Sequence, residues 1–149
     1  MQGNFIIRKY NENWDFIEEV SVGNGALNTG INELCRIHAG LSANTFSAAN
    51  TSIGVGDSNT AFNATQTDLQ GATKFYKACS TVTTGVNGGT TTTEIIVAVF
   101  GLTDAVQSWQ EFVWKQTATS NICLNRAVSN QGTKPNTQIW TVTLTITYA

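Results

Sequence analysis

The clearest pattern in the chain is a strict alternation of apolar and threonine positions near its end. A period of two is typical of a β-strand that buries one face in a core and turns a polar face outward. The apolar positions are Trp140, Val142, Leu144, Ile146 and Tyr148, and threonine occupies positions 141, 143, 145 and 147. This segment therefore predicts a half-buried strand in an antiparallel sheet.

Other segments show the same period or an equally β-rich composition. In residues 109–115, Phe112 and Trp114 share one face, and Glu111 and Val113 share the other. Further strands are expected in residues 53–55 and 90–100. Several strands separated by turn residues predict an all-β fold with one short helix, an antiparallel β-sandwich of jelly-roll-like character with long loops.

The first 24 residues form a segment of distinct composition. Residues 5–10 read as a strand, and residues 14–22 alternate like a second one. Residues 4–22 also carry 6 of the 18 charged residues. The pattern leaves open a strand pair or an extended docking arm, so we expect residues 1–24 to be such a segment and residues 25–149 to be a single sandwich domain.

One segment favours a helix. Asn28 or Thr29 could cap its start, and Gly40 could end it, because glycine readily adopts the left-handed conformation found after helix ends. The expected apolar face, at helical spacing, comprises Ile31, Leu34, Cys35 and His38.

Composition narrows the function classes. Charged residues make up 12% of the chain, about half the roughly 25% of ordinary domains, while 23 Thr and 15 Asn supply polarity. A net charge of −2 and a pI near 5.2 argue against nucleic-acid binding through a basic patch. No apolar run approaches the ~20 residues of a membrane span, and no signal-peptide pattern opens the chain, so we expect a protein made in a cytoplasm.

The chain offers little catalytic or metal-binding chemistry. His38 is the single imidazole, and no nucleophile motif accompanies it. Gly54 and Gly56 lack the third glycine of a dinucleotide loop, and residues 57–59 lack the Glu that ends a calcium loop. The cysteines are expected to be buried free thiols (Cys35, Cys79, Cys123). We therefore expect neither enzyme activity nor a cofactor or metal.

A sugar site is the remaining chemical alternative. Asp104 and Glu111 flank Trp109, and a tryptophan beside carboxylates suits carbohydrate binding or glycoside hydrolysis. The competing interpretation places Trp109 in the core or an interface, with Glu111 a polar strand residue paired with an arginine.

Several segments, taken in order, resemble small bacteriophage virion proteins identified as capsid decoration (cement) proteins, tail-fibre-like proteins or structural proteins. The resemblance covers about residues 25–149. It is carried by residues 28–34, 53–62, 65–69, 109–112, 123–126 and 132–134. The resemblance implies a protein of the capsid surface that is assembled into the virion in the bacterial cytoplasm. The expected partners are the major capsid protein and two further copies of the chain, which would form a homotrimer.

The sequence departs from the family pattern in three places. Val113 stands where the family has glycine, and the Thr-rich segment 81–93 reads as an inserted exposed tip. The charged N-terminal segment lies outside the resemblance, so we expect it to provide attachment specific to this virion.

The leading hypothesis is a non-enzymatic capsid decoration protein. The alternatives are a tail-tip, baseplate or fibre component and a carbohydrate-binding module. Low charge and several tryptophans suit an assembly protein, because interface cores are poor in charge and rich in aromatic anchors. The candidate interface residues are Phe5, Arg8, Tyr10, Trp14, Phe16, Trp109 and Trp114.

Overall fold

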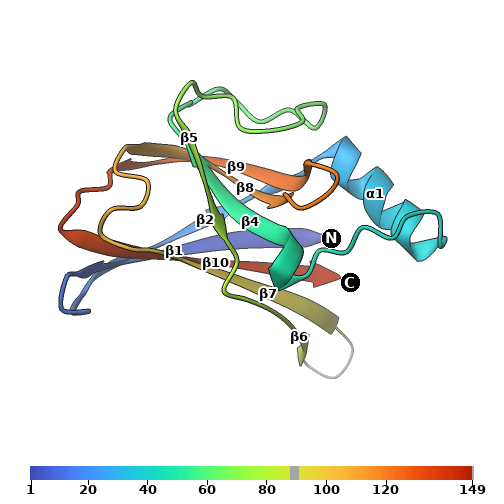
Figure 1. Ribbon diagram of the computed structural model, residues 1–149, viewed down its shortest axis with the longest axis horizontal. Helices are drawn as coiled ribbons and strands as arrows, with labels where there is room; N and C mark the ends of the chain where they lie inside the picture. Colours follow the sequence, from blue (N-terminus) through green and yellow to red (C-terminus); the bar gives the residue numbers. More distant parts are fainter. Residues whose placement is uncertain (88–90, 149) are drawn as a thin grey trace.

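A computed structural model describes residues 1–87 and 91–148, and it confirms an all-β sandwich with one α-helix (Figure 1). Within these residues, two five-stranded antiparallel sheets have the orders β2-β1-β10-β7-β6 (sheet A) and β3-β9-β8-β4-β5 (sheet B). The strands are β1 (Gln2–Asn11), β2 (Phe16–Gly23), β3 (Gly25–Ala26), β4 (Thr51–Gly56), β5 (Lys74–Ala78), β6 (Thr81–Asn87), β7 (Thr91–Phe100), β8 (Ser108–Gln116), β9 (Ile122–Thr133) and β10 (Gln138–Tyr148). The helices are α1 (Asn28–His38) and a short 3-10 turn, η1 (Ala48–Asn50).

The alternation in β10 and β8 is confirmed. In β10, the apolar positions from Trp140 to Ile146 are buried between the sheets, while the threonines between them are half-exposed on the outer face of sheet A. In β8, Phe112 and Trp114 enter the main core, whereas Val113 packs in a second cluster on the outer face of sheet B. The two sheets therefore enclose one apolar core, as a period of two requires.

The N-terminal segment is a structural part of the sandwich. Strand β1 lies between β2 and β10, and it pairs with β10 over its whole length, from Gln2 opposite Thr147 to Asn11 opposite Gln138. Phe5 and Ile7 are fully buried in the main core. The boundary expected at residue 24 does not separate two units, because the first strand supplies both core side chains and sheet hydrogen bonds.

The predicted helix exists, but its buried face is rotated. Of the predicted apolar face, Leu34 packs against the main core, whereas Ile31, Cys35 and His38 are exposed. The buried residues of the helix are Gly30 and Glu33. The cause is close packing: a Cβ on Gly30 would lie 2.5 Å from the Leu124 Cα in β9, so the helix turns its smallest residue toward the sheet.

The predicted C-terminal end of the helix is confirmed, whereas the predicted N-terminal caps are wrong. The residue before the first turn is Leu27 in an extended conformation, and no side chain of Asn28 or Thr29 caps the helix. Gly40 follows the C-cap with φ +71°, which confirms it as the left-handed residue after the helix. Within the described residues, no helix is long and apolar enough to cross a membrane.

The Thr-rich segment 81–93 is not simply a tip. Residues 81–87 form β6 and residues 91–93 begin β7, so most of the segment extends sheet A as a regular antiparallel pair. Residues 88–90 lie outside the described part of the chain.

Candidate interaction surface

Three of the seven predicted interface residues are core residues. Phe5, Trp109 and Trp114 have no exposed area. The Trp109 ring packs edge-on against Phe100 and Trp140, with centroids 4.7 and 4.8 Å away, and its Nε1 donates to the Ala105 carbonyl oxygen at 2.9 Å. The prediction that these three residues anchor a partner is therefore wrong, because their side chains fill the space between the sheets.

The other four predicted residues lie close together on the β1–β2 hairpin. Tyr10 packs against Trp14 at a centroid distance of 5.5 Å and against Phe16 at 6.1 Å. The exposed fractions are 54% for Trp14, 61% for Phe16 and 45% for the neighbouring Ile17. Tyr10, Trp14, Phe16 and Ile17 are called the aromatic tip below. The tip lies at the end of the molecule opposite α1 and the two chain termini (Figure 1).

A hydrogen-bonded turn positions the tip. The Asn11 side-chain oxygen accepts bonds from the backbone N–H groups of Asn13 and Asp15, both at 2.9 Å, and the Asn11 amide donates to the Asp15 carboxylate at 2.8 Å. This turn holds Trp14 at φ +66°, in the left-handed region. That conformation costs a non-glycine residue roughly 1–2 kcal/mol, and such strain is concentrated at functional positions.

Ion pairs fix the base of the hairpin. Lys9 is 8% exposed; its ammonium lies 4.4 Å from the Trp140 ring centroid and 2.8 Å from the Glu18 carboxylate. Beside it, Arg8 donates to Glu19 at 2.6 Å, and this hydrogen bond raises the pKa of the Arg8 guanidinium. The tip is therefore carried on a braced strand pair.

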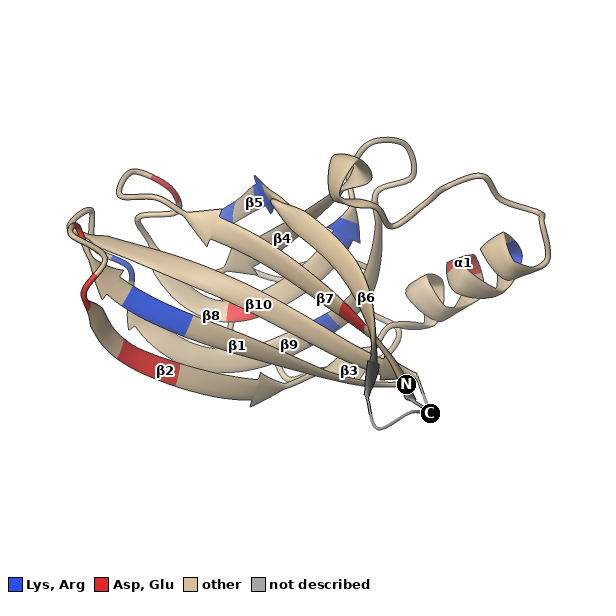
Figure 2. Ribbon diagram, turned by 90° about the horizontal axis from the view of Figure 1, so that it is seen from below, with Lys and Arg blue, Asp and Glu red and all other residues tan. Residues whose placement is uncertain are grey.

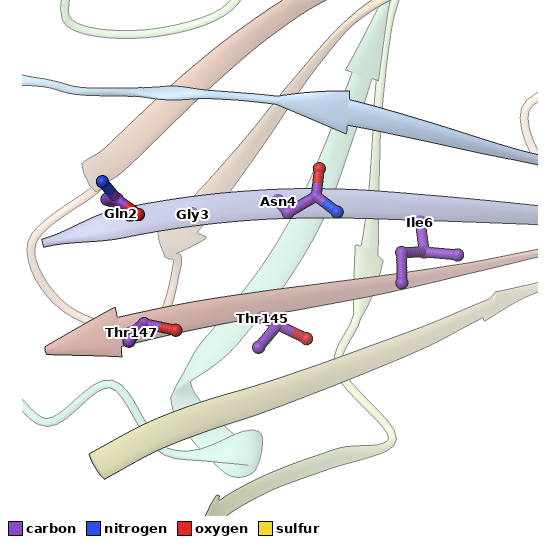
Figure 3. A pocket seen from close by; sticks show the side chains of 6 residues that line it. All are labelled: Gln2, Gly3, Asn4, Ile6, Thr145 and Thr147. Atoms are coloured by element: carbon purple, nitrogen blue, oxygen red, sulfur yellow. The ribbon is translucent and has the colours of Figure 1, made fainter. Parts of the chain in front are cut away.

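The outer face of sheet A continues from this hairpin with little charge. Figure 2 shows charged positions on β1 and β2 and one acidic position on β7, while β10 has none. Between β1 and β10 this face has a shallow hollow, and Figure 3 shows the side chains around it. The hollow is lined by Gln2, Gly3, Asn4, Ile6, Thr145 and Thr147. Its threonine and amide groups offer hydrogen bonds without a concentration of charge.

The outer face of sheet B is closed by the chain itself. Glu111 and Arg126 are both fully buried there, with an Arg126 nitrogen 2.7 Å from a Glu111 oxygen. Glu111 also accepts from the backbone N–H groups of Gln70 and Gly71, and Arg126 donates to the Thr60 carbonyl oxygen. This buried ion pair, which we call the loop clamp, fastens residues 57–73 over the sheet.

A second ion pair secures the same loop. Asp68 accepts from Lys115 at 2.5 Å and from the Tyr76 hydroxyl at 2.6 Å. Burial raises the pKa of Asp68, but these bonds and one from the Leu69 N–H outweigh it and hold that pKa below its usual value. Burial and the bond to Asp68 raise the pKa of Tyr76, so this hydroxyl stays a donor.

The candidate chemical sites do not assemble. The Glu111 carboxylate is held in the loop clamp, Asp104 pairs with Lys77 at 2.6 Å, and Trp109 is in the core, so the alternative sugar site around Trp109 is not formed. Asp57 accepts from the Thr73 N–H at 3.1 Å, which ties one end of the loop. In the part of the chain that the structure describes, no three His, Cys, Asp or Glu residues gather as a metal site.

The sequence pattern predicts strands in residues 5–10 and 14–22 and leaves open a strand pair or an extended arm; the structure forms the strand pair. The interpretation that pairs Glu111 with an arginine is confirmed, but the loop that this pair fastens was not predicted, because no local pattern links Glu111 or Arg126 to residues 40 or more positions away. The one available hint was Arg126, the only charged residue in β9. Comparison with protein-family models, curated proteins and solved structures finds no match to this chain.

Proposed function

We propose that this chain is a non-enzymatic structural protein of a bacteriophage virion, and that it decorates the capsid by docking its aromatic tip on the major capsid protein. The observation that carries the proposal is the exposure of Trp14 and Phe16, each by more than half, on a braced hairpin. Exposed aromatic side chains of this kind are typical anchors of protein interfaces.

The strain at Trp14 supports a role in binding. Glycine and asparagine adopt the left-handed conformation more easily than tryptophan does, so the backbone conformation does not by itself favour a tryptophan at position 14. The fold instead retains a large ring there, more than half exposed. The tip therefore presents apolar surface at some cost to stability, as an interaction site does.

Charge and sequence order give further support. The chain has 12% charged residues, and a protein whose surface is largely covered in an array has less need of charge for solubility. The ordered resemblance over about residues 25–149 to phage virion proteins supports a place in the virion, in the capsid or in the tail.

The test is cosedimentation with capsid shells of the parent phage that lack this protein. The wild-type chain should bind saturably, with hundreds of copies per shell. Trp14→Ala and Phe16→Ala should each weaken binding by at least about thirtyfold, the effect of a 2 kcal/mol anchor. Leu41→Ala is the matched control, because Leu41 is 71% exposed and follows α1 by three residues. Helix α1 lies at the end of the molecule opposite the tip (Figure 1).

Three outcomes would refute the proposal. Equal binding by the wild type and both tip variants would remove the tip as the docking site. Binding to purified tails at a few dozen copies, with none to shells, would favour the tail alternative. Specific glycan binding that is lost in Trp14→Ala, without shell binding, would favour the carbohydrate-binding module.

A further inference from the structure

Three of the four sheet edges in the described structure carry features that prevent strand pairing with another chain. Strand β2 has Glu18 and Glu19 and a register shift opposite Lys9 and Tyr10. Strand β3 has only two residues, and β5 has Lys74 and Lys77 in five residues. Short length, charge and bulges are the usual means by which edge strands avoid edge-to-edge association.

The fourth edge lacks all of these features. Strand β6 is seven residues long, with the uncharged and proline-free sequence TVTTGVN, and it pairs with β7 in unbroken register. Strand β7 is its only sheet neighbour in the described residues. Because residues of an antiparallel strand direct their N–H and C=O groups to alternate sides, about half of these groups on β6 face away from β7.

The β6 sequence itself indicates a partner. Read in either direction from Thr84, the segment meets valine at the second position, at 82 and at 86, and small or polar residues elsewhere. A segment with this near-symmetry can pair antiparallel with its own copy, and a two-fold contact requires such self-complementarity. Thr84 would then face its counterpart across the axis, in a Thr–Thr cross-strand pair of a favourable kind.

We propose that two copies of this chain associate through β6, antiparallel and centred on Thr84, to form a ten-stranded sheet from their two A sheets. The aromatic tip lies on the β1–β2 hairpin, at the opposite edge of sheet A, so the contact leaves both tips free. The symmetry is two-fold, which differs from the trimer implied by the family resemblance. A single strand pair buries little area, so we expect a dimer of micromolar affinity.

The first experiment is sedimentation equilibrium of the full chain without capsids, from about 1 to 500 µM. The mass should rise from 16.0 kDa toward twice that value with concentration. Thr83→Lys, which places charge on the exposed β6 edge, should weaken the dimer at least tenfold. Thr143→Lys makes the same charge change in the middle of sheet A, on β10, and should leave the dimer unchanged. Thermal melting of each variant checks folding.

The second experiment tests the register. With Cys35→Ser to remove the exposed thiol, Thr84→Cys should form a covalent dimer on mild oxidation, because a residue on the axis faces its own copy about 5 Å away. Thr143→Cys in the same background should stay monomeric on a non-reducing gel. A monomer at every concentration, a trimer, a dimer unaffected by Thr83→Lys, or no cross-link at position 84 would each overturn the proposal. None of these results depends on capsid binding, so this proposal and the proposed function can fail separately.

Discussion

Removing the negative charge from the loop clamp should destabilise the fold severely. In Glu111→Gln, the Arg126 guanidinium stays fully buried with only neutral acceptors around it, among them the oxygens of Gln66 and Thr60. The new amide NH₂ also replaces one of the two carboxylate oxygens, so either Arg126 or the loop backbone loses its acceptor. Breaking a buried ion pair on one side costs about 3–5 kcal/mol, because the other charge is left without compensation in a poorly solvated place. This is a large part of the 5–15 kcal/mol that stabilises a typical domain.

The loss can be measured by urea unfolding followed by tryptophan fluorescence. We expect the midpoint to fall with little change in slope, and the melting temperature to drop by roughly 6–20 °C, at 2–4 °C per kcal/mol for a chain of this size. Protease cleavage within residues 57–73 should also accelerate, because Glu111 binds the backbone N–H groups of Gln70 and Gly71.

A double-mutant cycle provides the control. Glu111→Leu combined with Arg126→Met removes both charges, so the double variant should lose clearly less stability than the sum of the two single variants. A cost below about 1 kcal/mol for Glu111→Gln, or strict additivity in the cycle, would refute the view that this pair holds the loop.

Three further predictions concern pH, thiols and truncation. The pKa of Asp68 is lower in the folded protein than in the unfolded chain, where it is about 3.9. The ionised Asp68 therefore stabilises the fold above that pH, and this contribution is lost as the pH falls through the lower folded-state pKa, so stability should decline in acid. A flat urea midpoint from pH 6 to 3 would contradict this. In the native protein a maleimide should label the exposed Cys35. Cys79 and Cys123 should react much more slowly, because burial shields both thiols and raises their pKa. Mass spectrometry of the labelled peptides shows which cysteines have reacted. Deleting residues 1–20 should abolish folding, because it removes β1 and most of β2 from sheet A and takes Phe5 and Ile7 out of the core. A sharp thermal transition in the truncated chain would show otherwise.

The sandwich was predictable because each strand shows its buried and exposed faces in its own short stretch of sequence. The alternation from Trp140 to Tyr148 defines an inner and an outer face without knowledge of any other strand, and the structure has both. The same reasoning failed at α1, where apolar periodicity favours Ile31 and Cys35. The observed face depends on a backbone contact of Gly30 and on Glu33, whose carboxylate accepts from Ser42 and Asn44. Tertiary partners of this kind leave no trace in a hydrophobic pattern.

The candidate interface was predictable in part for the same reason. Hydrophobicity alone does not distinguish an aromatic residue in the core from one at a binding surface, so Trp109 and Trp14 looked equivalent in the sequence. The structure separates them, because Trp14 lies in the turn between β1 and β2, whereas the sequence pattern assigned residues 14–22 to a strand. For the loop clamp, the sequence separation between Glu111 and Gly71 precluded any local inference.

The pairing of β1 with β10 determines how the molecule responds to force. The N- and C-terminal ends of the described chain lie side by side at one end of sheet A, with Gln2 opposite Thr147 (Figure 1). Tension applied to these two ends would pull the strands apart one hydrogen bond at a time, like a zipper, rather than load all the bonds of the pair together in shear. A force applied at the aromatic tip acts on the other end of β1, which is hydrogen-bonded to β2 on one side and to β10 on the other. The fold is therefore expected to resist a pull on the tip better than a pull on its own ends.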